Sequence, residues 1–584
     1  MHYISSVEIE NFRSCQNVIV ELSPFTPLVG YNNAGKSNII LAVQWLIKGK
    51  SLENKDFFND SDCSPDSAEV IGTIEGITEG LLNTLGDVHK SKIEKFIDNS
   101  QLKIKRSQSK NNKSELWVWN DSNWNDSKWN KNPTGIDNAI KVLFPEPIRI
   151  GAMDNATEDV SKSKTSTTIG KLLSEFISPI KDEHETKLKP HFDEIQKSLS
   201  AQGDSRLSEL NKFDTSINEK IKDFFPDMSL KIDIKTPSFD EIFKDGGTIR
   251  VYENGNEGRD CSAYGHGAQR AIQMALIRHL ADIKSSDSDP SPTTLLLIDE
   301  PELYLHPFAI EQTREALKTL SKKGYQVLFS THSPQMITAK DAQNTLLIRK
   351  ESHSTKVRKR LGKAIQETVP DSNSQEELLF SLTHSSQILF SEIVVLAEGK
   401  TEQRLFPFLF EKVSKKTLGQ KNIAFIQLDG VGNTAKSMKI LDAMDLPAKA
   451  IVDLDYILLY AKHHGLDDKC ADFESVNSIF QRLEIEGKVS LKSGSPKKFD
   501  NNSEKPFSLL AQELEAKNAI ENIHNLFKSK NVWVWKQGTI ENILELSDKN
   551  VKTHSQFKTN MNNKDIEDFP FYDELRELVE WLSA

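Results

Sequence analysis

The stretch GYNNAGKS at residues 30–37 decides the fold of the N-terminal half. It satisfies the pattern G-x-x-x-x-G-K-S and lies between an apolar, strand-like segment at residues 25–29 and a helical pattern at residues 36–46. In this context the glycines let backbone N–H groups face phosphate oxygens, and the N-terminus of the helix favours negative charge. The pattern therefore predicts a nucleoside-triphosphate site.

The polar residues of this loop have separate expected tasks. Lys36 is expected to reach the β- and γ-phosphates, and the Ser37 hydroxyl to ligate Mg²⁺. The residues predicted to bind the nucleotide here are Gly30, Asn32, Asn33, Gly35, Lys36, Ser37 and Asn38. ATP and Mg²⁺ are the expected cofactors of this half.

A second apolar segment, residues 294–298, ends in two carboxylates. Asp299 is expected to bind the nucleotide and its Mg²⁺, and Glu300 to polarise the attacking water. Taken alone, the segment also fits an ordinary buried strand with solvated acids at its tip. The stretch PELYLHP follows at once, and VLFSTHSP at residues 327–334 places His332 just past another buried strand, which favours the catalytic interpretation.

Two apolar segments of the second half also end in carboxylates. Residues 393–397 lead to Glu398, with Glu402 one helical turn later, and a later segment ends in Asp453 and Asp455. The carboxyl ends of parallel strands are where α/β sheets place their chemistry, and oxygen ligands suit hard divalent cations. A lone D-x-D at a strand end is usually solvated, so the metal prediction depends on the ordered set.

The order of the motifs in the first half resembles the ABC-type ATPases of the Rad50, RecF and OLD group. The resemblance rests on residues 30–37, on DEPELYLHP at residues 299–307 and on STHSP at residues 330–334. It implies that His332 is the switch histidine that senses the γ-phosphate. It also implies that Arg13, in the opening strand and turn, approaches the nucleotide.

YGHGAQR at residues 264–270 occupies the place of this group's signature motif, with Tyr264 where serine is usual. In the group, ATP lies between the phosphate loop of one protomer and the signature of the other. The resemblance therefore implies a homodimer or higher oligomer in which Gly265 and Gly267 contact nucleotide. A Q-loop is not placed, because the candidate at residues 150–155 lacks the expected glutamine.

The second half resembles the Toprim domain of topoisomerases, primases and OLD nucleases. The resemblance rests on Glu398 and Gly399, on QLDGVGN at residues 427–433, on DLD at residues 453–455 and on WVWKQGTIE at residues 533–541. It implies a site for two Mg²⁺ or Mn²⁺ ions, with phosphodiester hydrolysis as the reaction. The ligands it implies are Glu398, Glu402, Asp453, Asp455 and Glu541.

The same resemblance assigns further roles. Glu398, Asp453 and Asp455 would be catalytic, Lys536 would lie beside the scissile phosphate, and Asp429 is a second candidate. A topoisomerase would need a transesterifying tyrosine on a separate domain, which the sequence does not show. Tyr456, next to the D-x-D, is weak evidence for that chemistry.

The combination of the two halves resembles the single-chain, phage-encoded OLD type over nearly the whole chain. We predict an α/β fold, with an ABC-type (Rad50/RecF-like) ATPase at residues 1–166 and 229–385. Apolar residues at helical spacing predict an inserted helical dimerisation element at residues 167–228. An α/β Toprim nuclease domain is predicted at residues 386–584, and strands of the first domain are predicted to resume at residues 229–234 and 248–252.

Composition limits the class of protein. The 584 residues contain no apolar run approaching the ~18 residues of a membrane span, and the first residues lack a secretory signal. The four cysteines form no C-x-x-C pair, so a cytoplasmic protein without a membrane association is expected. A net charge of −11 does not suit coating of nucleic acid by bulk electrostatics, although it allows a local basic groove.

These observations favour an ATP-hydrolysing, divalent-metal-dependent DNA endonuclease, in anti-phage defence or phage exclusion. The alternative is a DNA-bound sensing or structural ATPase of the Rad50 or RecF kind with an inactive Toprim domain. A partner such as a retron reverse transcriptase with its DNA is compatible with the same chemistry. The basic run at residues 356–363 fits either a DNA guide or a solvated surface, and the Trp-rich segment at residues 116–119 is interpreted as a decorated hairpin.

Overall fold

A computed structural model of the chain describes residues 1–59, 65–120, 128–152, 168–223, 227–237, 239, 241, 249–253, 257–284, 292–338, 341, 343–368, 385–428, 431–492, 495–496, 504–562 and 564–583. The chain divides into two compact units. The first comprises Met1–Leu28, Asn33–Met336 and Lys350–Lys356, and the second comprises Val29–Asn32, Ile337–Arg349 and Val357–Ala584. Among the helices described, none is both long and apolar enough to cross a membrane. The division into four segments at residues 166, 228 and 385 stays a prediction.

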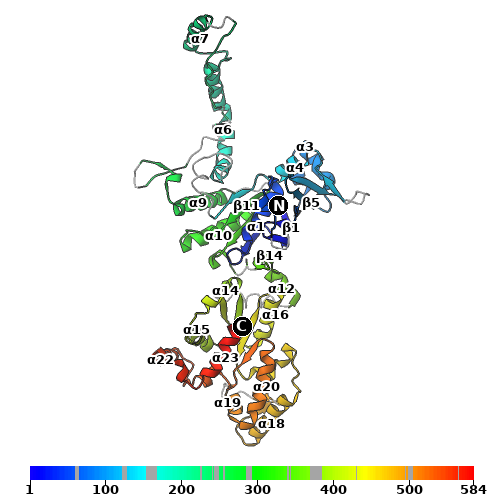
Figure 1. The fold of residues 1–584 in the computed structure, drawn as a ribbon, viewed down its shortest axis with the longest axis vertical. Helices are drawn as coiled ribbons and strands as arrows, with labels where there is room; N and C mark the ends of the chain where they lie inside the picture. The colour runs from blue at the N-terminus through cyan, green and yellow to red at the C-terminus, as the bar shows by residue number, and fades with distance from the viewer. Residues whose placement is uncertain are drawn as a thin grey trace. The chain divides into compact units, whose positions relative to one another are not determined.

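One layer of the first unit is a six-stranded antiparallel sheet (Figure 1). Its order is β2-β1-β4-β5-β6-β7. The strands are β1 (Tyr3–Phe12), β2 (Cys15–Glu21), β4 (Ser67–Glu75), β5 (Leu102–Ser109), β6 (Glu115–Trp119) and β7 (Trp129–Lys131). Every second residue of β4 and β5 is buried, as expected for strands with one face on a core and one toward water.

A second six-stranded sheet carries the nucleotide motifs. Its order is β14-β13-β3-β12-β11-β8. The strands are β3 (Phe25–Val29), β8 (Ile148–Ile150), β11 (Thr294–Asp299), β12 (Tyr325–Thr331), β13 (Leu346–Glu351) and β14 (Ser354–Val357). Parallel β11 and β12 are buried along their whole length, which explains the apolar runs at their centres, residues 295–298 and 327–329. Their carboxyl ends bring the segments after Asp299 and Thr331 to the same edge of the sheet.

Helices of the first unit lie beside these sheets and in the insertion. They are α1 (Lys36–Lys48), α2 (Glu79–Thr84), α3 (Asp87–Ile93), α4 (Ile136–Leu143), α6 (Thr168–Leu199), α7 (Ser208–Ile221), α9 (His266–Lys284) and α10 (Pro307–Ser321). Helix α1 begins at the phosphate loop and buries an apolar face that includes Ile39, Ile40, Val43, Leu46 and Ile47. That burial fixes the loop at the N-terminus of the helix.

The inserted segment is helical, as its periodicity predicts. Helix α6 extends away from the sheets of the first unit and leads to α7 (Figure 1). The strand predicted at residues 229–234 is wrong. Asn218 Oδ1 accepts a hydrogen bond from Leu230 N at 2.8 Å, and Asp214 Oδ1 accepts one from Ile232 N at 3.1 Å. Side chains of α7 thus take backbone groups that a neighbouring strand would have taken.

The strand predicted at residues 248–252 is shorter than expected. It is β9 (Arg250–Val251), which pairs with β10 (Arg259–Asp260) in a separate two-stranded sheet.

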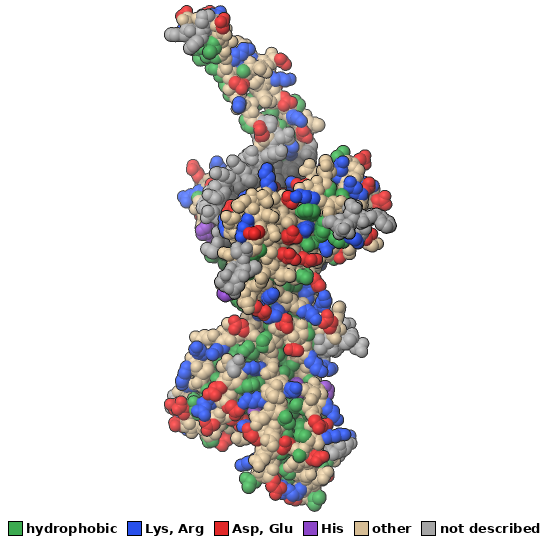
Figure 2. Space-filling view, turned by 45° about the vertical axis from the view of Figure 1, so that its right-hand side comes forward, with side chains coloured by type: hydrophobic (Ala, Val, Ile, Leu, Met, Phe, Trp, Pro, Cys, Tyr) green, Lys and Arg blue, Asp and Glu red, His purple; other side chains and the backbone are tan. Residues whose placement is uncertain are grey.

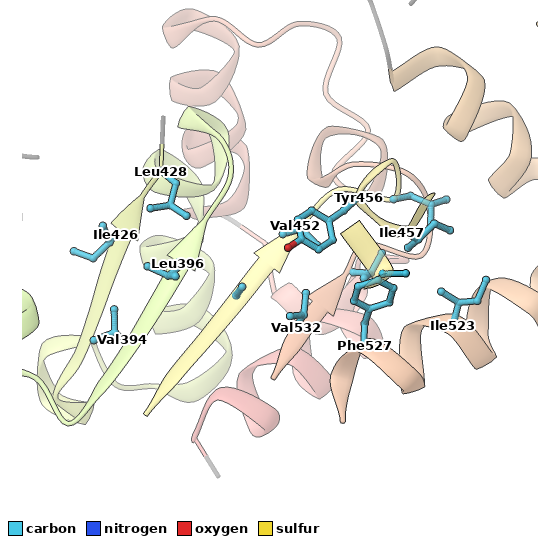
Figure 3. Close-up of a cluster of buried hydrophobic side chains, with 14 of the residues drawn as sticks. Val394, Leu396, Ile426, Leu428, Val452, Tyr456, Ile457, Ile523, Phe527 and Val532 are labelled. Carbon is cyan, nitrogen blue, oxygen red and sulfur yellow. The ribbon is translucent and has the colours of Figure 1, made fainter. Parts of the chain in front are cut away.

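The second unit is built on a four-stranded parallel sheet of order β16-β15-β17-β20. Its strands are β15 (Ile393–Ala397), β16 (Ile423–Gln427), β17 (Ala448–Val452) and β20 (Val532–Val534). Strands β15 and β17 are the two apolar segments of this half that were predicted to end in carboxylates. Alternate residues of β15 face two cores. Val394 and Leu396 belong to the cluster drawn in Figure 3, and Val395 and Ala397 belong to another. Burial on both faces is typical of a parallel sheet covered by helices.

Helices cover both faces of this sheet. They are α12 (Leu361–Thr368), α14 (Ser385–Phe390), α15 (Lys400–Ser414), α16 (Thr434–Ala443), α17 (Tyr456–Tyr460), α18 (Ala471–Ile485), α19 (Glu504–Gln512), α20 (Lys517–Lys528), α21 (Ile540–Ile543), α22 (Val551–Asn562) and α23 (Tyr572–Ser583), with a small hairpin of β18 (Leu491–Lys492) and β19 (Ser495–Pro496). Phe406 of α15 and Leu575 of α23 pack with Val395, whereas Ile440 of α16 and Ile523 of α20 share the cluster of Val394. The strand ends are therefore held by cores on both sides.

Candidate nucleotide and metal sites

The phosphate loop has a conformation that requires glycine at one point. Gly35 has φ +105°, and a Cβ there would overlap the Thr355 hydroxyl. Thr355 Oγ1 donates to Ala34 O at 3.1 Å and lies 2.7 Å from Ser14 Oγ. Asn38, predicted to bind nucleotide, donates through Nδ2 to Ser14 Oγ at 2.7 Å. The turn between β1 and β2 and strand β14 thus brace the loop.

The predicted magnesium-binding pair is brought together. Ser37 Oγ donates to Asp299 Oδ1 at 2.7 Å, and Ser330 Oγ donates to the same oxygen at 3.0 Å. Arg149 NH2 lies 3.6 Å from Asp299 Oδ2. Arg149 stands on the short strand β8 outside any recognisable motif, so no sequence pattern indicated it. Asp299 is 3% exposed, and its charge is balanced within the site.

The two predicted catalytic residues of this half lie together, and His332 contacts Lys36. His332 Nε2 lies 2.9 Å from Lys36 Nζ and 3.6 Å from Glu300 Oε1. Burial and the Lys36 charge lower the pKa of His332, so its neutral ring can accept from the ammonium group. Glu300 has a backbone φ of +49°, a conformation that residues other than glycine seldom adopt. The motifs at residues 30–37, 299–300 and 332 therefore form one constellation.

The signature motif opens helix α9. Gly265 has no neighbouring atom within 4 Å of an added Cβ, so its backbone can be approached closely. Gly267 lies in the first turn. Arg270, four residues into α9 from His266, donates to Asp299 O at 2.6 Å and to Glu300 O at 2.7 Å. The signature helix is thus bonded to the end of β11, a link that the sequence motif did not reveal.

Arg13 lies in the turn after β1 and is paired with a carboxylate. Its Nε and NH2 donate to Asp56 Oδ1 at 2.9 and 2.7 Å. With Trp45 and Lys48, these two residues line a cavity of about 340 Å³ beside α1. Its predicted approach to the nucleotide stays a prediction.

The carboxylates of the second unit follow the carboxyl ends of its strands. Glu398 Oε2 accepts a hydrogen bond from Asp453 N at 3.2 Å, across the neighbouring strands β15 and β17. Glu402 lies in the first turn of α15 and is 2% exposed. A Cβ on Gly399 would lie 2.6 Å from Glu402 Oε2, so this glycine lets the carboxylate fold back. Glu541, on α21, is 8% exposed.

Electrostatics show that these groups share one environment. Burial, then the charge of Asp455, raises the pKa of Glu398 to about 8. Burial, then Glu541, raises the pKa of Glu402 to about 7. The pKa of Asp453 is also raised, first by burial and then by all four of the other carboxylates. The five carboxylates therefore lie near enough to one another to repel, and their role as metal ligands stays a prediction.

This donor set fits a hard divalent cation by its chemistry. All five groups are carboxylates, and the buried Asp453 Oδ1 has no hydrogen-bond partner in the part of the chain that the structure describes. Within the described residues, no three ligating side chains are grouped tightly enough to hold an ion as they stand. Binding would require the carboxylates to rotate toward a common point.

One cation beside the carboxylates was not predicted from the sequence. Lys549 Nζ lies 3.5 Å from Glu541 Oε2, and its charge opposes the rise in the pKa of both Glu398 and Glu402. It stands in the loop between α21 and α22, outside any motif.

The predicted Lys536 is engaged elsewhere. Its Nζ lies 3.0 Å from Glu521 Oε2 and 3.8 Å from Glu577 Oε2. It lines an acidic cavity of about 1010 Å³ together with Glu541.

Other candidates are placed differently. Asp429 lies outside the described residues. Tyr456 is fully buried, lies 2.7 Å from His464 Nε2 through its hydroxyl, and has a raised pKa because of burial. A phenol so placed is a poor nucleophile for DNA.

The basic run at residues 356–363 is partly neutralised. Arg358 lies 2.9 Å from Asp445, and Lys359 lies 2.5 Å from Glu367. The Trp-rich hairpin contains the edge-to-face pair Trp119 and Trp129, with lysine ammonium groups over the rings. These contacts favour structural interpretations of both segments.

Comparison with known proteins gives two family matches. The model of the AAA ATPase domain matches residues 2–337, and that of the Overcoming lysogenization defect protein-like TOPRIM domain matches residues 389–455. An Smc head domain derived from Pyrococcus furiosus is similar over 63% of this chain and 98% of its own, at 17% identity and a TM-score of 0.39. This similarity is too low to support a conclusion about the present chain.

Curated relatives cover the chain more fully. The Old nuclease of Escherichia phage P2 is 40% identical over 598 residues, which cover 99% of each chain. Endonuclease GajA of Bacillus cereus strain VD045 is 24% identical and covers 70% of this chain and 68% of its own. The OLD nuclease of Thermus scotoductus is 21% identical over 77% of this chain and 82% of its own.

The two family matches correspond to the sheets that carry the two sets of motifs, and the phage P2 relative is similar from end to end. The chain therefore belongs to the OLD nuclease family, with an AAA-type ATPase domain followed by a TOPRIM domain.

Proposed function

We propose that this protein is an ATP-hydrolysing, divalent-metal-dependent DNA endonuclease. The observation that carries the proposal is the set of carboxylates at the strand ends of the TOPRIM sheet, three of which have raised pKa values. Buried like charges of this kind are stabilised by bound cations. The nuclease names of the relatives support the same assignment.

The TOPRIM residues divide the work of phosphodiester hydrolysis. Glu398, Glu402, Asp453, Asp455 and Glu541 would hold Mg²⁺ or Mn²⁺, which supplies an activated water and neutralises charge on the leaving oxygen. We place the positive charge that faces the phosphate on Lys549 and not on Lys536. Lys549 lies beside Glu541, whereas Lys536 is paired with two glutamates outside the set, Glu521 and Glu577.

In the ATPase, Lys36 would bind the β- and γ-phosphates while Ser37 and Asp299 hold the Mg²⁺ of the nucleotide. Glu300 would polarise the attacking water. His332, bonded to Lys36 and adjacent to Glu300, would contact the γ-phosphate. Its neutral ring suits a hydrogen bond that depends on the state of the phosphate.

Several partners belong to this proposal. A homodimer would let Gly265 and Gly267 of one protomer contact nucleotide bound by the other. Contact with DNA would be local, because the net charge is −11 and acidic and basic side chains are interspersed on the face seen in Figure 2. A role in anti-phage defence or phage exclusion is consistent with the relatives, an Old nuclease of phage P2 and endonuclease GajA. A retron reverse transcriptase with its DNA is a separate hypothesis that genomic neighbours would test.

Purified protein incubated with supercoiled and linear DNA tests the function. Mg²⁺, Mn²⁺ and ATP are varied, with Lys36→Ala and Glu398→Ala in parallel. We expect metal-dependent cleavage that Glu398→Ala abolishes, while Lys36→Ala removes ATP hydrolysis and reports the direction of ATP control. If no DNA is cut under any condition, or if Glu398→Ala cuts normally, the sensing ATPase with an idle TOPRIM domain is the better description.

A further inference from the structure

We infer that Glu302 is a positioning residue of the ATPase, which fixes the backbone of the switch histidine His332. Glu302 Oε1 accepts two hydrogen bonds, each of 2.8 Å, from Thr331 Oγ1 and from His332 N. The inference rests on the proposed role of His332 and adds a residue to which no role has been given.

The position of Glu302 in the sheet explains what it can do. It lies three residues beyond Asp299, in the turn after β11, and its carboxylate reaches the end of the neighbouring parallel strand β12. Glu300 precedes Glu302 by two residues in the same turn. The hydrogen bonds of Glu302 therefore connect the segment of Glu300 to the segment of His332. The Glu300 carboxylate and the His332 ring are 3.6 Å apart, and we expect the bonds of Glu302 to help keep them there.

Burial of the Glu302 carboxylate costs free energy of folding. Its second oxygen, Oε2, is buried and has no hydrogen-bond partner in any other described residue, and burial raises the pKa of the group. Arg270 supplies an opposite charge nearby, but its own NH2 bonds go to Asp299 O and Glu300 O. A buried acid with an unsatisfied oxygen calls for an explanation, and placement of His332 provides one.

The contacts of His332 predict which kinetic constant Glu302 affects. The backbone N–H of His332 is held by Glu302, while its ring contacts Lys36 and Glu300. Loss of the anchor would displace the ring from the γ-phosphate side of the site. Lys36 and Ser37 would still bind ATP, so the loss should appear in kcat and not in the affinity for ATP.

The experiment uses the full chain and a double-mutant cycle. Glu302→Ala, Glu302→Gln, His332→Ala and Glu302→Ala/His332→Ala are compared for ATP dissociation constant, steady-state kcat and thermal midpoint. Glu311→Gln is the matched control, because Glu311 lies on α10 with its side chain 63% exposed. We expect Glu302→Ala to lower kcat about tenfold, with little change in ATP affinity. Glu302→Gln, which keeps an acceptor oxygen, should recover most of this loss.

The double variant gives the deciding result. If Glu302 acts through His332, Glu302→Ala/His332→Ala should be no slower than His332→Ala. The inference would be overturned if the losses of kcat in the two single variants multiply in the double variant. It would also be overturned if Glu302→Ala has a normal kcat, or if its loss is confined to the affinity for ATP. A normal rate for His332→Ala would instead refute the proposed role of His332.

A second cycle covers the case in which Glu302→Ala does not fold. Thr331→Val removes one of the two donors to Glu302 and is combined with His332→Ala in the same way. We expect a smaller loss of kcat from Thr331→Val, and no further loss in the double variant. Independent losses there would overturn the inference.

Discussion

The nucleotide site and the carboxylate site of this chain both lie at the carboxyl ends of parallel strands. They differ in how the charges of their side chains are balanced. Around the phosphate loop, Asp299 is bonded to Ser37 and lies near Arg149, and His332 is bonded to Lys36. In the TOPRIM unit five carboxylates gather with Lys549 as a neighbouring cation. The first site is preorganised by its own residues, whereas the second needs charge from outside.

The pKa directions express the same difference. The pKa of His332 is lowered, so that residue is neutral in a site that already contains a lysine. The pKa values of Glu398 and Glu402 are raised to about 8 and about 7, so near neutral pH these groups retain protons that a cation would displace. A substitution in the carboxylate site should therefore change DNA cleavage without changing ATP hydrolysis.

The largest expected effect separates the two activities. Glu398→Ala or Asp453→Ala should reduce DNA cleavage at least about 100-fold, because loss of a metal ligand is no milder than loss of a group that supports one. ATP hydrolysis by the same variants should change little. Both rates are measured on one preparation, with Asp442→Asn as control because Asp442 is exposed on α16. Parallel loss of both activities would contradict the separation.

The next effect concerns stability and pH. At Glu398 and Glu402 the raised pKa values mean that the folded state binds more protons than the unfolded state between about pH 4.5 and 8, so the contribution of these two groups to stability should fall as pH rises through this window. In chelator the loss from pH 6 to 8 should be on the order of 2 kcal/mol, and Mg²⁺ should reduce it. Thermal unfolding of the wild type, Glu402→Gln and Glu411→Gln measures this. Glu402→Gln should flatten the pH profile, and exposed Glu411 should not matter. A flat wild-type profile in chelator would be inconsistent with a shared carboxylate site.

A smaller effect distinguishes the two candidate lysines. Lys549→Ala should lower cleavage about tenfold through lost electrostatic stabilisation, and Lys536→Ala should lower it less. Lys549→Arg should retain more activity than Lys549→Ala, since it keeps the charge. Cleavage rates at saturating Mg²⁺ give the ranking. If Lys536→Ala is the more damaging variant, the phosphate-facing charge belongs to Lys536.

Sequence patterns predicted the parts of the fold that are set by burial. The TOPRIM strands β15 and β17 were predicted, because parallel strands buried on both faces are mostly apolar. The strand at residues 229–234 was predicted wrongly, because its backbone bonds side chains of α7 that no local pattern reveals.

The same distinction applies to the sites. Residues delivered by a strand end, such as Asp299 and Asp453, could be identified from apolar segments followed by carboxylates. Arg149 and Lys549 could not, because one lies on a three-residue strand and the other in a loop. They join their sites through tertiary packing alone. The motifs identified acidic groups well and the cations that balance them poorly.

The smallest expected effect tests whether the tyrosine beside the D-x-D takes part in the chemistry. Tyr456→Phe removes the hydroxyl that meets His464 and should cost about 1 kcal/mol of stability. Cleavage should remain within about twofold of the wild type, because a hydrolytic site uses water as nucleophile. Urea unfolding and cleavage are measured together, with a search for a covalent protein–DNA product in denaturing gels. A covalent product that Tyr456→Phe abolishes would replace hydrolysis by transesterification. In that case the Tyr456 hydroxyl would be the nucleophile of the reaction, and the carboxylates would act together with it.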